Sequence, residues 1–510
     1  MKYERVRNTR RNAVWGLMEK GLSLLLPFLV RTALIHTMGL SYGGVGGLFS
    51  SILQLLSLAE MGLSNAIVFS MYKPLAENDG DAVCALMSFY RKAYRLIGLG
   101  ILGAGLLAAP FLHLLVKGDR PPELNLGAVY LVYLANTCVS FFVYPECRAL
   151  LSAAHRHDVI SKSAMAARLT CCLAQLAALL LARSYALYVI MLPLCTLLDG
   201  LICASCARRA YPDFRCRGSI TAEKRRDMAE KVKGLFIHRV CGSTRNAFDS
   251  IFISAFLGLA PVGMYGNYYY ILYSVRGLLD ALTQGMSAGV GNSVAVESAE
   301  KNLKDLKNLT FLYEWVCGFC TVCLLVLYQP FIRLWMGEGR MFGNDAVIVF
   351  CVSFYVWTMG DIKSQYADAR GIWWKDRLRA LTESLCNVLL NWLLVRSFGV
   401  VGVILATAVS ILLVGFPWST WILFKDYFGV RHLPGYLGVQ LFYALVTVMA
   451  CILTWYVASL LPWDGLGALA ARLLLCLVVP NLIYFLCYFK TPCFRSALPL
   501  IRAILKRTET

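Results

Sequence analysis

Apolar blocks of roughly 20 residues recur along almost the whole chain, and a helix of that length crosses about 30 Å of hydrocarbon. Main-chain polar groups cannot stay unpaired in lipid, so each block must be a helix or a barrel strand. Barrel strands are about ten residues long and alternate apolar with polar positions, which these blocks do not. Only 15% of the residues are charged, against about 25% in soluble domains. The chain is therefore predicted to be an all-α integral membrane protein.

The blocks predict fourteen transmembrane helices in the 510 residues. The second and eighth blocks are long enough to be tilted or broken, and residues 81–92 are predicted to form an amphipathic helix along the membrane surface. The predicted spans are 12–37, 43–72, 93–116, 126–152, 159–182, 184–206, 234–258, 262–292, 305–328, 346–369, 379–398, 400–424, 436–461 and 466–488.

The distribution of positive charge tests this number of spans. If the N-terminus is cytoplasmic, the inner segments together carry 35 Lys and Arg residues and the outer loops carry 6. An excess of Lys and Arg marks cytoplasmic loops. One span more or fewer would place every later loop on the opposite side of the membrane. Both termini are thus predicted to be cytoplasmic. The net charge of +19 reflects orientation in a membrane, and no nucleic-acid partner is predicted.

The chain divides into two halves that resemble a repeat. Gly39, Leu40, Gly44 and Gly47 match residues 258, 259, 263 and 266 at a constant offset of 219. Parallel repeats of six helices would be related by an axis along the membrane normal. The predicted segments are an N-terminal six-helix lobe (1–206), a basic cytoplasmic linker (207–233), a C-terminal six-helix lobe (234–428), two additional helices (429–490) and a cytoplasmic tail (491–510).

Catalytic and metal-binding motifs are not found in the sequence. It contains no GxxxxGK[ST], HExxH or GxSxG pattern, and its predicted outer loops are too short for the paired acids of a membrane polymerase. Most of the 19 cysteines lie in apolar blocks, where cysteine behaves as a small hydrophobe. The pair Cys203 and Cys206 has no second pair at zinc spacing. We predict no enzyme activity, no metal, no cofactor and no disulfides.

Charged residues inside the spans are the candidate functional residues, because they usually face a partner or a wet cavity. Arg245, Asp249, Arg276 and Asp280 lie near mid-membrane, and Arg31 lies nearer the outer end. Arg245 can neutralise Asp249, and Arg276 can neutralise Asp280, because each aspartate lies one helical turn after its arginine. These pairs are either structural clasps or the lining of a cavity for an anionic substrate, since guanidinium groups suit phosphate.

A second candidate is Glu60, which lies among small residues in Ser57-Leu58-Ala59-Glu60-Met61-Gly62. It is either hydrogen-bonded packing at a helix break or a site for a coupling ion. Glu314, Asp361 and Lys363 are further charged positions within the spans.

The N-terminal region resembles bacterial polysaccharide-biosynthesis flippases of the multidrug/oligosaccharidyl-lipid/polysaccharide exporter superfamily. The similar stretches are Arg10-Arg11-Asn12, Arg31-Thr32-Ala33-Leu34-Ile35-His36-Thr37-Met38-Gly39, Gly46-Gly47-Leu48-Phe49-Ser50-Ser51-Ile52-Leu53, Leu56-Ser57-Leu58-Ala59-Glu60-Met61-Gly62 and Ala66-Ile67-Val68-Phe69-Ser70-Met71-Tyr72-Lys73-Pro74-Leu75-Ala76.

This resemblance implies two six-helix lobes around a central cavity, with fourteen helices in the bacterial cytoplasmic membrane. It implies movement of an undecaprenyl-diphosphate-linked oligosaccharide from the inner to the outer leaflet, for capsule, exopolysaccharide or O-antigen synthesis. Family cavities are cationic, which would suit Arg31, Arg245 and Arg276. Implied partners are membrane lipids, a polysaccharide polymerase and glycosyltransferases. A drug/cation antiporter and a peptidoglycan or teichoic precursor flippase stay open as alternatives.

Overall fold

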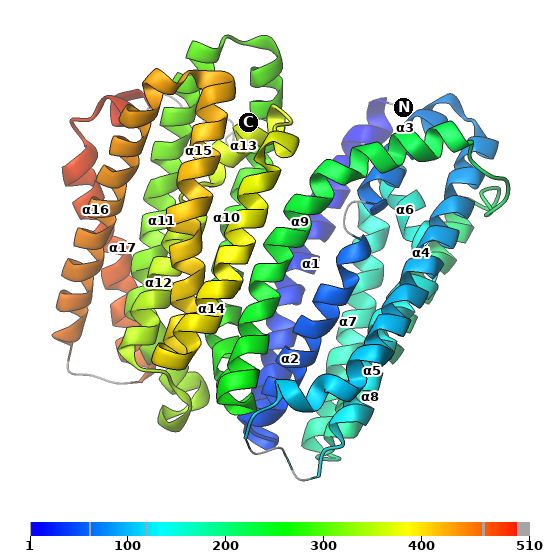
Figure 1. Cartoon of the computed structure of the whole chain (residues 1–510), viewed down its shortest axis with the longest axis horizontal. Coiled ribbons are helices and arrows are strands. Elements are labelled where there is room, and N and C mark those ends of the chain that lie inside the picture. Colours follow the sequence, from blue (N-terminus) through cyan, green and yellow to red (C-terminus); the bar gives the residue numbers. More distant parts are fainter. Residues whose placement is uncertain (1, 61–62, 119–120, 122, 462–464, 497–510) are drawn as a thin grey trace. The chain divides into compact units, whose positions relative to one another are not determined.

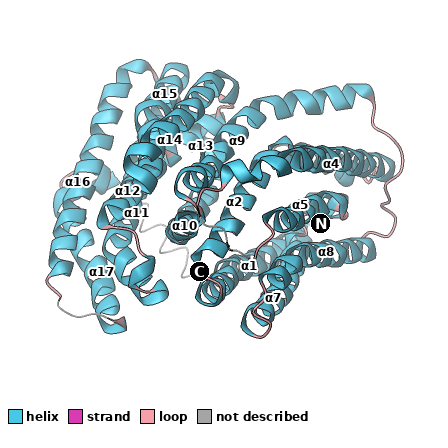
Figure 2. Ribbon diagram, turned by 60° about the horizontal axis from the view of Figure 1, so that its bottom comes forward, coloured by secondary structure: helices cyan, strands magenta, loops and turns pink. Residues whose placement is uncertain are grey.

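All regular elements of the described chain are helical. The computed structural model describes residues 2–60, 63–118, 121, 123–461 and 465–496, and no strand occurs in these ranges (Figures 1 and 2). The predicted all-α class is therefore confirmed. The chain separates into two compact units, residues 1–263 and 264–510, and each is described by itself below.

Unit 1 buries one large apolar core, in which Phe49, Tyr130 and Phe141 are almost completely enclosed. The long helix α10 (Leu259–Val296) begins in this unit and continues into unit 2. The other elements of unit 1 are α1 (Lys2–Thr37), α2 (Leu40–Leu56), η1 (Ser57–Glu60), α3 (Leu63–Glu77), α4 (Gly80–Ala108), η2 (Ala109–Leu115), α5 (Leu126–Phe142), α6 (Pro145–Ala153), α7 (His157–Leu180), α8 (Tyr185–Ala210) and α9 (Ala222–Leu257).

In unit 2, α16 and α17 pack beside each other and against α11 (Figure 1). Their contact buries Phe311, Tyr443 and Tyr484. The elements that follow α10 are α11 (Ala299–Met336), η3 (Glu338–Arg340), α12 (Asn344–Thr358), α13 (Asp361–Ala369), α14 (Trp373–Ser410), η4 (Ile411–Gly415), α15 (Phe416–Leu423), η5 (Phe424–Phe428), η6 (Val430–His432), α16 (Leu433–Ser459) and α17 (Leu466–Tyr488).

A helix or a pair of helices lies at the position of every predicted span. Within the described residues, eight helical stretches are long and apolar enough to cross a membrane by themselves, and α5 with α6 would form a ninth, bent by 50°. The number of fourteen spans and the five predicted segments stay predictions.

The second predicted span is broken, as its length suggested. Helix α2 ends at Leu56 and is followed by the 3₁₀ turn η1. The prediction of a surface helix over 81–92 was wrong, because these residues are the beginning of α4. Asp79 caps that helix by accepting a hydrogen bond of 3.0 Å from the main-chain nitrogen of Ala82. The apolar side chains of Val83 and Leu86 then pack into the core of unit 1.

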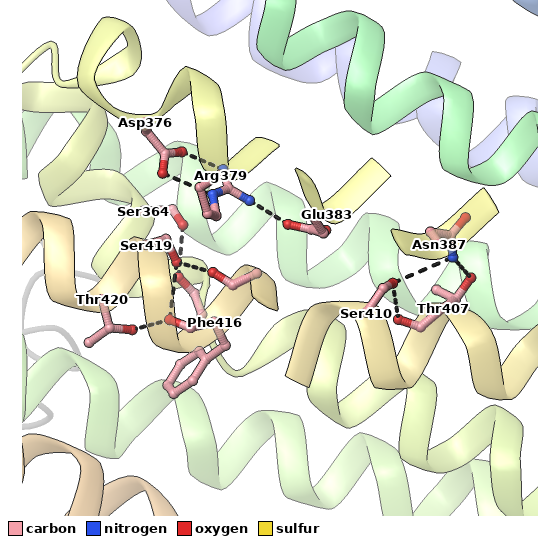
Figure 3. Close-up of polar contacts among 12 residues, drawn as sticks. Ser364, Asp376, Arg379, Glu383, Asn387, Thr407, Ser410, Phe416, Ser419 and Thr420 are labelled. Atoms are coloured by element: carbon pink, nitrogen blue, oxygen red, sulfur yellow. Dashed lines mark hydrogen bonds and ion pairs between the residues drawn. The ribbon is translucent and has the colours of Figure 1, made fainter. Parts of the chain in front are cut away.

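The eleventh and twelfth predicted spans meet where the sequence predicted, at Gly399. Its main-chain angles, φ 57° and ψ −133°, interrupt α14, and this conformation favours glycine. A Cβ at Gly402 would lie 2.2 Å from the main-chain oxygen of Leu394, so the chain folds back without a loop. Asn387 donates hydrogen bonds across this hairpin to Thr407 at 3.1 Å and, more weakly, to Ser410 (Figure 3).

The repeat predicted from the glycines is supported by a reciprocal contact within unit 1. A Cβ added at Gly44 would lie 1.9 Å from the main-chain oxygen of Leu259, and a Cβ added at Gly263 would lie 2.2 Å from that of Leu40. Gly44 and Gly263 are 219 positions apart, and so are Leu40 and Leu259. The counterparts of the two residues in one contact therefore form the other contact, as expected for repeats related by a two-fold axis.

Candidate functional site

Arg276 is the best-enclosed of the three predicted site arginines and lies on α10 in unit 2. Its side chain is 10% exposed, and its Nε lies 3.0 Å from the carboxylate of Asp280 one turn further along the helix. The predicted pair is therefore formed. Asp280 is 38% exposed, so one end of the pair is much more accessible than the other.

A second carboxylate, from another helix, completes the surroundings of Arg276. Asp361 is the first residue of α13; its Oδ1 accepts a hydrogen bond of 2.8 Å from Nη2 of Arg276, and its Oδ2 lies 2.8 Å from Nη1 in an ion pair. The hydrogen bond between the two charged groups is of the strong, charge-assisted kind. The Tyr313 hydroxyl also donates to Asp361, and the guanidinium lies 4.9 Å from the ring centroid of Trp357. Arg276 is thus held by two acids and one aromatic face.

Asp361 can occupy this place because the fourth helix of this half is interrupted. Helix α12 ends at Thr358, and α13 begins at Asp361 after the pair Met359-Gly360. An acid in the first helical turn is stabilised by the helix dipole. The sequence identified Asp361 as an intramembrane charge, but its partner is 85 positions away, and no sequence signal indicated that contact.

Further polar groups of unit 2 lie on α13 and on the hairpin of α14 and α15, and Figure 3 shows Ser419, Asp376, Arg379 and Glu383 among them. The Lys363 amine donates to the Ser419 hydroxyl and lies 4.9 Å from the ring centroid of Phe416. Arg379 forms ion pairs with Asp376 and Glu383 along α14. Unit 2 therefore holds a series of charged side chains in its interior, from Asp280 to Asp376.

The other predicted cationic residues lie in unit 1. A terminal nitrogen of Arg31 on α1 donates to the main-chain oxygen of Gly263 at 3.1 Å, which links α1 to the first turns of α10. On α9, Asp249 is 3% exposed and Arg245 is half-buried. The described contacts do not bring Arg31, Arg245 and Arg276 together, and their common role in a cavity stays a prediction.

Glu60 lies at the helix break that the sequence suggested. It is in η1, and its carboxylate accepts a hydrogen bond of 2.6 Å from the hydroxyl of Tyr94, which is 3% exposed. This contact fits the interpretation of Glu60 as packing at a break. The role of a coupling-ion site stays a prediction.

Ion pairs in unit 1 join α1 to α7. Asp158 is approached by Arg11 at 2.9 Å and Arg156 at 3.0 Å, and its main-chain nitrogen donates to Asn12 at 2.8 Å. Arg11 and Asn12 belong to the stretch that carries the family resemblance, so part of that signature is a clasp between α1 and α7. Arg168 and Glu19 form a further pair at 2.8 Å.

Metal and thiol chemistry find no support in the described ranges. No group of three or more His, Cys, Asp or Glu residues there is arranged to hold a metal ion. Cys216 lies in the segment between α8 and α9, where burial raises the pKa of its thiol to about 11. It is therefore protonated, and unreactive as a nucleophile, at neutral pH.

Comparison with solved structures identifies the class of fold. The lipid II flippase MurJ in an inward-closed conformation superposes with a TM-score of 0.66 at 15% identity, covering 94% of this chain and 98% of MurJ. An inward-facing multidrug resistance MATE transporter of the MOP superfamily gives 0.62 at 15% identity, covering 78% and 94%. A Vibrio cholerae MATE transporter gives 0.56 at 14% identity, covering 82% and 97%. The chain has the fold of these membrane transporters.

The family follows from the sequence comparison. Residues 9–285 match the family described as polysaccharide biosynthesis protein, and the chain belongs to that family. No curated protein matches the chain. The expected resemblance is thus confirmed, and the solved structures named above that share the fold are a flippase and transporters.

Proposed function

We propose that this chain is a flippase that moves an undecaprenyl-diphosphate-linked oligosaccharide from the inner to the outer leaflet of the bacterial cytoplasmic membrane. The product would serve capsule, exopolysaccharide or O-antigen synthesis. Membership of the polysaccharide biosynthesis family and the fold shared with a lipid II flippase support this proposal. A polymerase and glycosyltransferases are the proteins expected to act in the same pathway as this chain.

The observation that carries the proposal is the setting of Arg276. A guanidinium inside a span is expensive unless it is paired, and here two carboxylates hold it. A phosphate group of a diphosphate can present two acceptor oxygens to a guanidinium, as a carboxylate does. A substrate can therefore replace Asp280, the more exposed of the two partners, while Asp361 keeps the guanidinium oriented.

The site must release the diphosphate as readily as it binds it. A site that bound the diphosphate too tightly in one conformation would hold it there, because a ligand shifts an equilibrium only by its difference in affinity for the two states. Asp280 would return to Arg276 when the substrate leaves and would restore the pair. The lobes would alternate between inward-open and outward-open states, while the polyprenyl chain stays in lipid.

The test is transport in proteoliposomes with a fluorescent polyprenyl-diphosphate oligosaccharide. Arg276→Gln should reduce the initial flipping rate by about 100-fold, because loss of a charge-assisted, desolvated contact costs roughly 3 kcal/mol. Arg217→Gln is the matched control, since Arg217 is 68% exposed and should retain the normal rate. Normal flipping by a folded Arg276→Gln protein would refute the role of Arg276.

The second candidate is a drug/cation antiporter, favoured by the likeness to MATE structures and by acids such as Glu314 in the interior. Drug susceptibility of an efflux-deficient host that expresses the chain separates the two functions. Flipping without drug resistance supports the flippase, whereas resistance without flipping supports the antiporter. A flippase for a peptidoglycan or teichoic precursor would be recognised by its headgroup preference in the same proteoliposomes.

A further inference from the structure

Glu314 is an acid in the interior of unit 2 that the proposed substrate path does not use. It lies on α11, its side chain is 3% exposed, and its carboxylate faces the hydroxyl group of Tyr355 on α12. Within the described ranges no Lys, Arg or His is paired with it. An ionised carboxylate in such a place would be strongly disfavoured. Glu314 is therefore held as the neutral acid in this conformation.

The groups that face Glu314 are hydroxyls, thiols and one further acid. Tyr355 of α12 and Asp361 of α13 act directly on its charge. The charged residues of η5, which also packs against α11, are engaged elsewhere, because Lys375 pairs with Asp426 and Lys425 lies over Trp421. The remaining titratable neighbours are Tyr313 and Cys317 of α11, Tyr436 and Tyr443 of α16 and Tyr488 of α17.

Several buried polar atoms on α11 and on the helices packed against it form no hydrogen bond of good geometry with the protein. They come from four helices, α11, α12, α16 and α17. Buried polar groups without a protein partner are the usual positions of ordered water. These atoms are the hydroxyl oxygens of Thr310, Tyr355, Thr454 and Tyr484 and the amide oxygen of Gln440.

A glycine keeps this polar region open. Gly318 lies one turn beyond Glu314 on α11, and a Cβ at this position would lie 2.4 Å from the Tyr484 hydroxyl and 2.7 Å from that of Thr447. The absent side chain thus allows two hydroxyl groups, from α17 and α16, to approach α11 on the side of Glu314.

A cavity of about 650 Å³ lies between α11, α12, α16 and α17. Most of its lining is apolar; its polar lining residues include Thr321, Tyr355 and Thr447, and Arg333 and Arg472 border the end that the charge pattern assigns to the outer side. Seven residues separate Thr321 from Glu314, which corresponds to about 10 Å along a helix. Tyr355 borders the cavity and also faces Glu314.

We propose that Glu314 is a proton-binding site that is reached from the outer side through this cavity, and that its occupancy is linked through Asp361 to anion binding at Arg276. The link rests on the proposed function. Tyr313, the neighbour of Glu314 in the chain, donates to Asp361, which in turn holds Arg276.

The linkage works through the charge on Asp361. While Arg276 pairs with Asp361, that carboxylate stays ionised and Glu314 keeps its proton. When an anion replaces Asp280 at Arg276, the guanidinium shares its charge with the anion and neutralises Asp361 less fully, so Asp361 binds a proton from Glu314: the O–H bond at Glu314 breaks and one forms at Asp361. Glu314 then takes a new proton from the cavity. One proton is taken up for each anion bound, so the added charge inside the membrane is reduced.

The first test measures protonation directly and needs no substrate. Dicyclohexylcarbodiimide modifies neutral carboxyl groups in apolar surroundings, so the purified full chain should be labelled at Glu314 at neutral pH. Glu146 is the internal control, because it is 0% exposed but paired with Arg91, and it should stay unlabelled. Loss of the label in Glu314→Gln is expected. A protein labelled equally at both sites, or at neither, would overturn the proposal.

The second test measures coupling. Inorganic pyrophosphate is added to unbuffered protein in detergent, and a pH indicator follows proton uptake. Uptake of about one proton per bound anion is expected for the unmodified chain and none for Glu314→Gln. Tyr355→Phe should slow the uptake without abolishing it. Anion binding with the same uptake in Glu314→Gln would overturn the linkage.

The third test separates this inference from the proposed function. Flipping is measured in proteoliposomes with an imposed pH gradient, with Glu77→Gln as control because Glu77 is 59% exposed. A gradient response that Glu314→Gln removes and Glu77→Gln retains supports both. Flipping that ignores the gradient in all three proteins refutes the proton site alone. Absence of flipping with labelling at Glu314 intact refutes the flippase alone.

Discussion

The fourth predicted span is interrupted in both halves of the molecule, and the interruptions carry different charge chemistry. In unit 1, α5 ends at Phe142 and α6 begins at Pro145; in unit 2, α12 ends at Thr358 and α13 begins at Asp361. Each short helix has an acid in its first turn, Glu146 or Asp361. The interruptions are about one repeat apart, so the backbone device is common to the halves.

The partners of these acids differ. One oxygen of Glu146 accepts from two nitrogens of Arg91, at 2.9 and 2.6 Å, and Arg91 is 31% exposed. Asp361 uses both oxygens on Arg276, which is only 10% exposed and is also bound by Asp280. Unit 1 thus has a simple pair with one solvated member, whereas unit 2 has a shared, enclosed arginine. The same helix interruption therefore positions a structural ion pair in unit 1 and the proposed substrate-binding ion pair in unit 2.

The largest difference is expected from removing the two acids. Asp361→Ala should lower the free energy of unfolding by about 3–5 kcal/mol, because it strips an enclosed arginine of its two-point partner. Glu146→Ala should cost only about 1 kcal/mol, since water can reach Arg91. Chemical unfolding in detergent micelles measures both. Equal losses would contradict the proposed contrast between the breaks.

A smaller effect is expected at the contact where the halves are equivalent. Gly44→Ala and Gly263→Ala should each cost about 1–3 kcal/mol, because the added methyl group would overlap a main-chain oxygen. The two losses should be similar, since the contact is reciprocal. Gly100→Ala is the control: a Cβ there meets no atom within 4 Å. Thermal unfolding of the purified proteins would show whether the repeat is symmetric at this point.

Replacement of arginine by lysine probes geometry at constant charge. Arg276→Lys should lower the flipping rate by about tenfold, since an ammonium cannot contact two oxygens of one group in a plane. Arg91→Lys should leave the rate unchanged, because Glu146 presents one oxygen only. The proteoliposome assay measures both. If the two variants were equally impaired, the distinction between site and clasp would fail.

The smallest effect is expected for Asp280→Asn. Asp280 is 38% exposed, so its pair with Arg276 should contribute no more than about 1 kcal/mol to stability. Removal of its charge also removes a competitor of the substrate for Arg276. Titration with pyrophosphate should therefore show tighter binding than in the unmodified chain. Weaker binding would mean that Asp280 assists the anion rather than competing with it.

Much of this fold could be predicted, because hydropathy and loop charge act locally along the chain. The apolar blocks predicted where helices lie, and the boundary at Gly399 was correct. The pair of Arg276 and Asp280 followed from one-turn spacing on a helix. The surface helix over 81–92 was wrong, since an amphipathic pattern does not say whether the apolar face meets lipid or another helix.

The contacts between distant helices could not be predicted. Apolar length fixes that a helix crosses the membrane, but not how it is rotated about its axis. The sequence therefore did not determine whether Asp361 faces Arg276 or Glu383. It also did not indicate that Glu314 would be paired with no cation among the described residues. A weak signal did exist: polar residues recur at helical spacing on α16, at Gln440, Thr447 and Thr454, all of them are buried, and α16 packs against the helix that carries Glu314.

The hairpin at Gly399 has a consequence for how the protein enters the bilayer. Its two helices reverse at one residue, and Asn387 on the first satisfies its amide with Thr407 and Ser410 on the second. Either helix alone would present these polar groups to hydrocarbon, which is costly. The two helices are therefore best released from the insertion machinery together, as one preassembled pair.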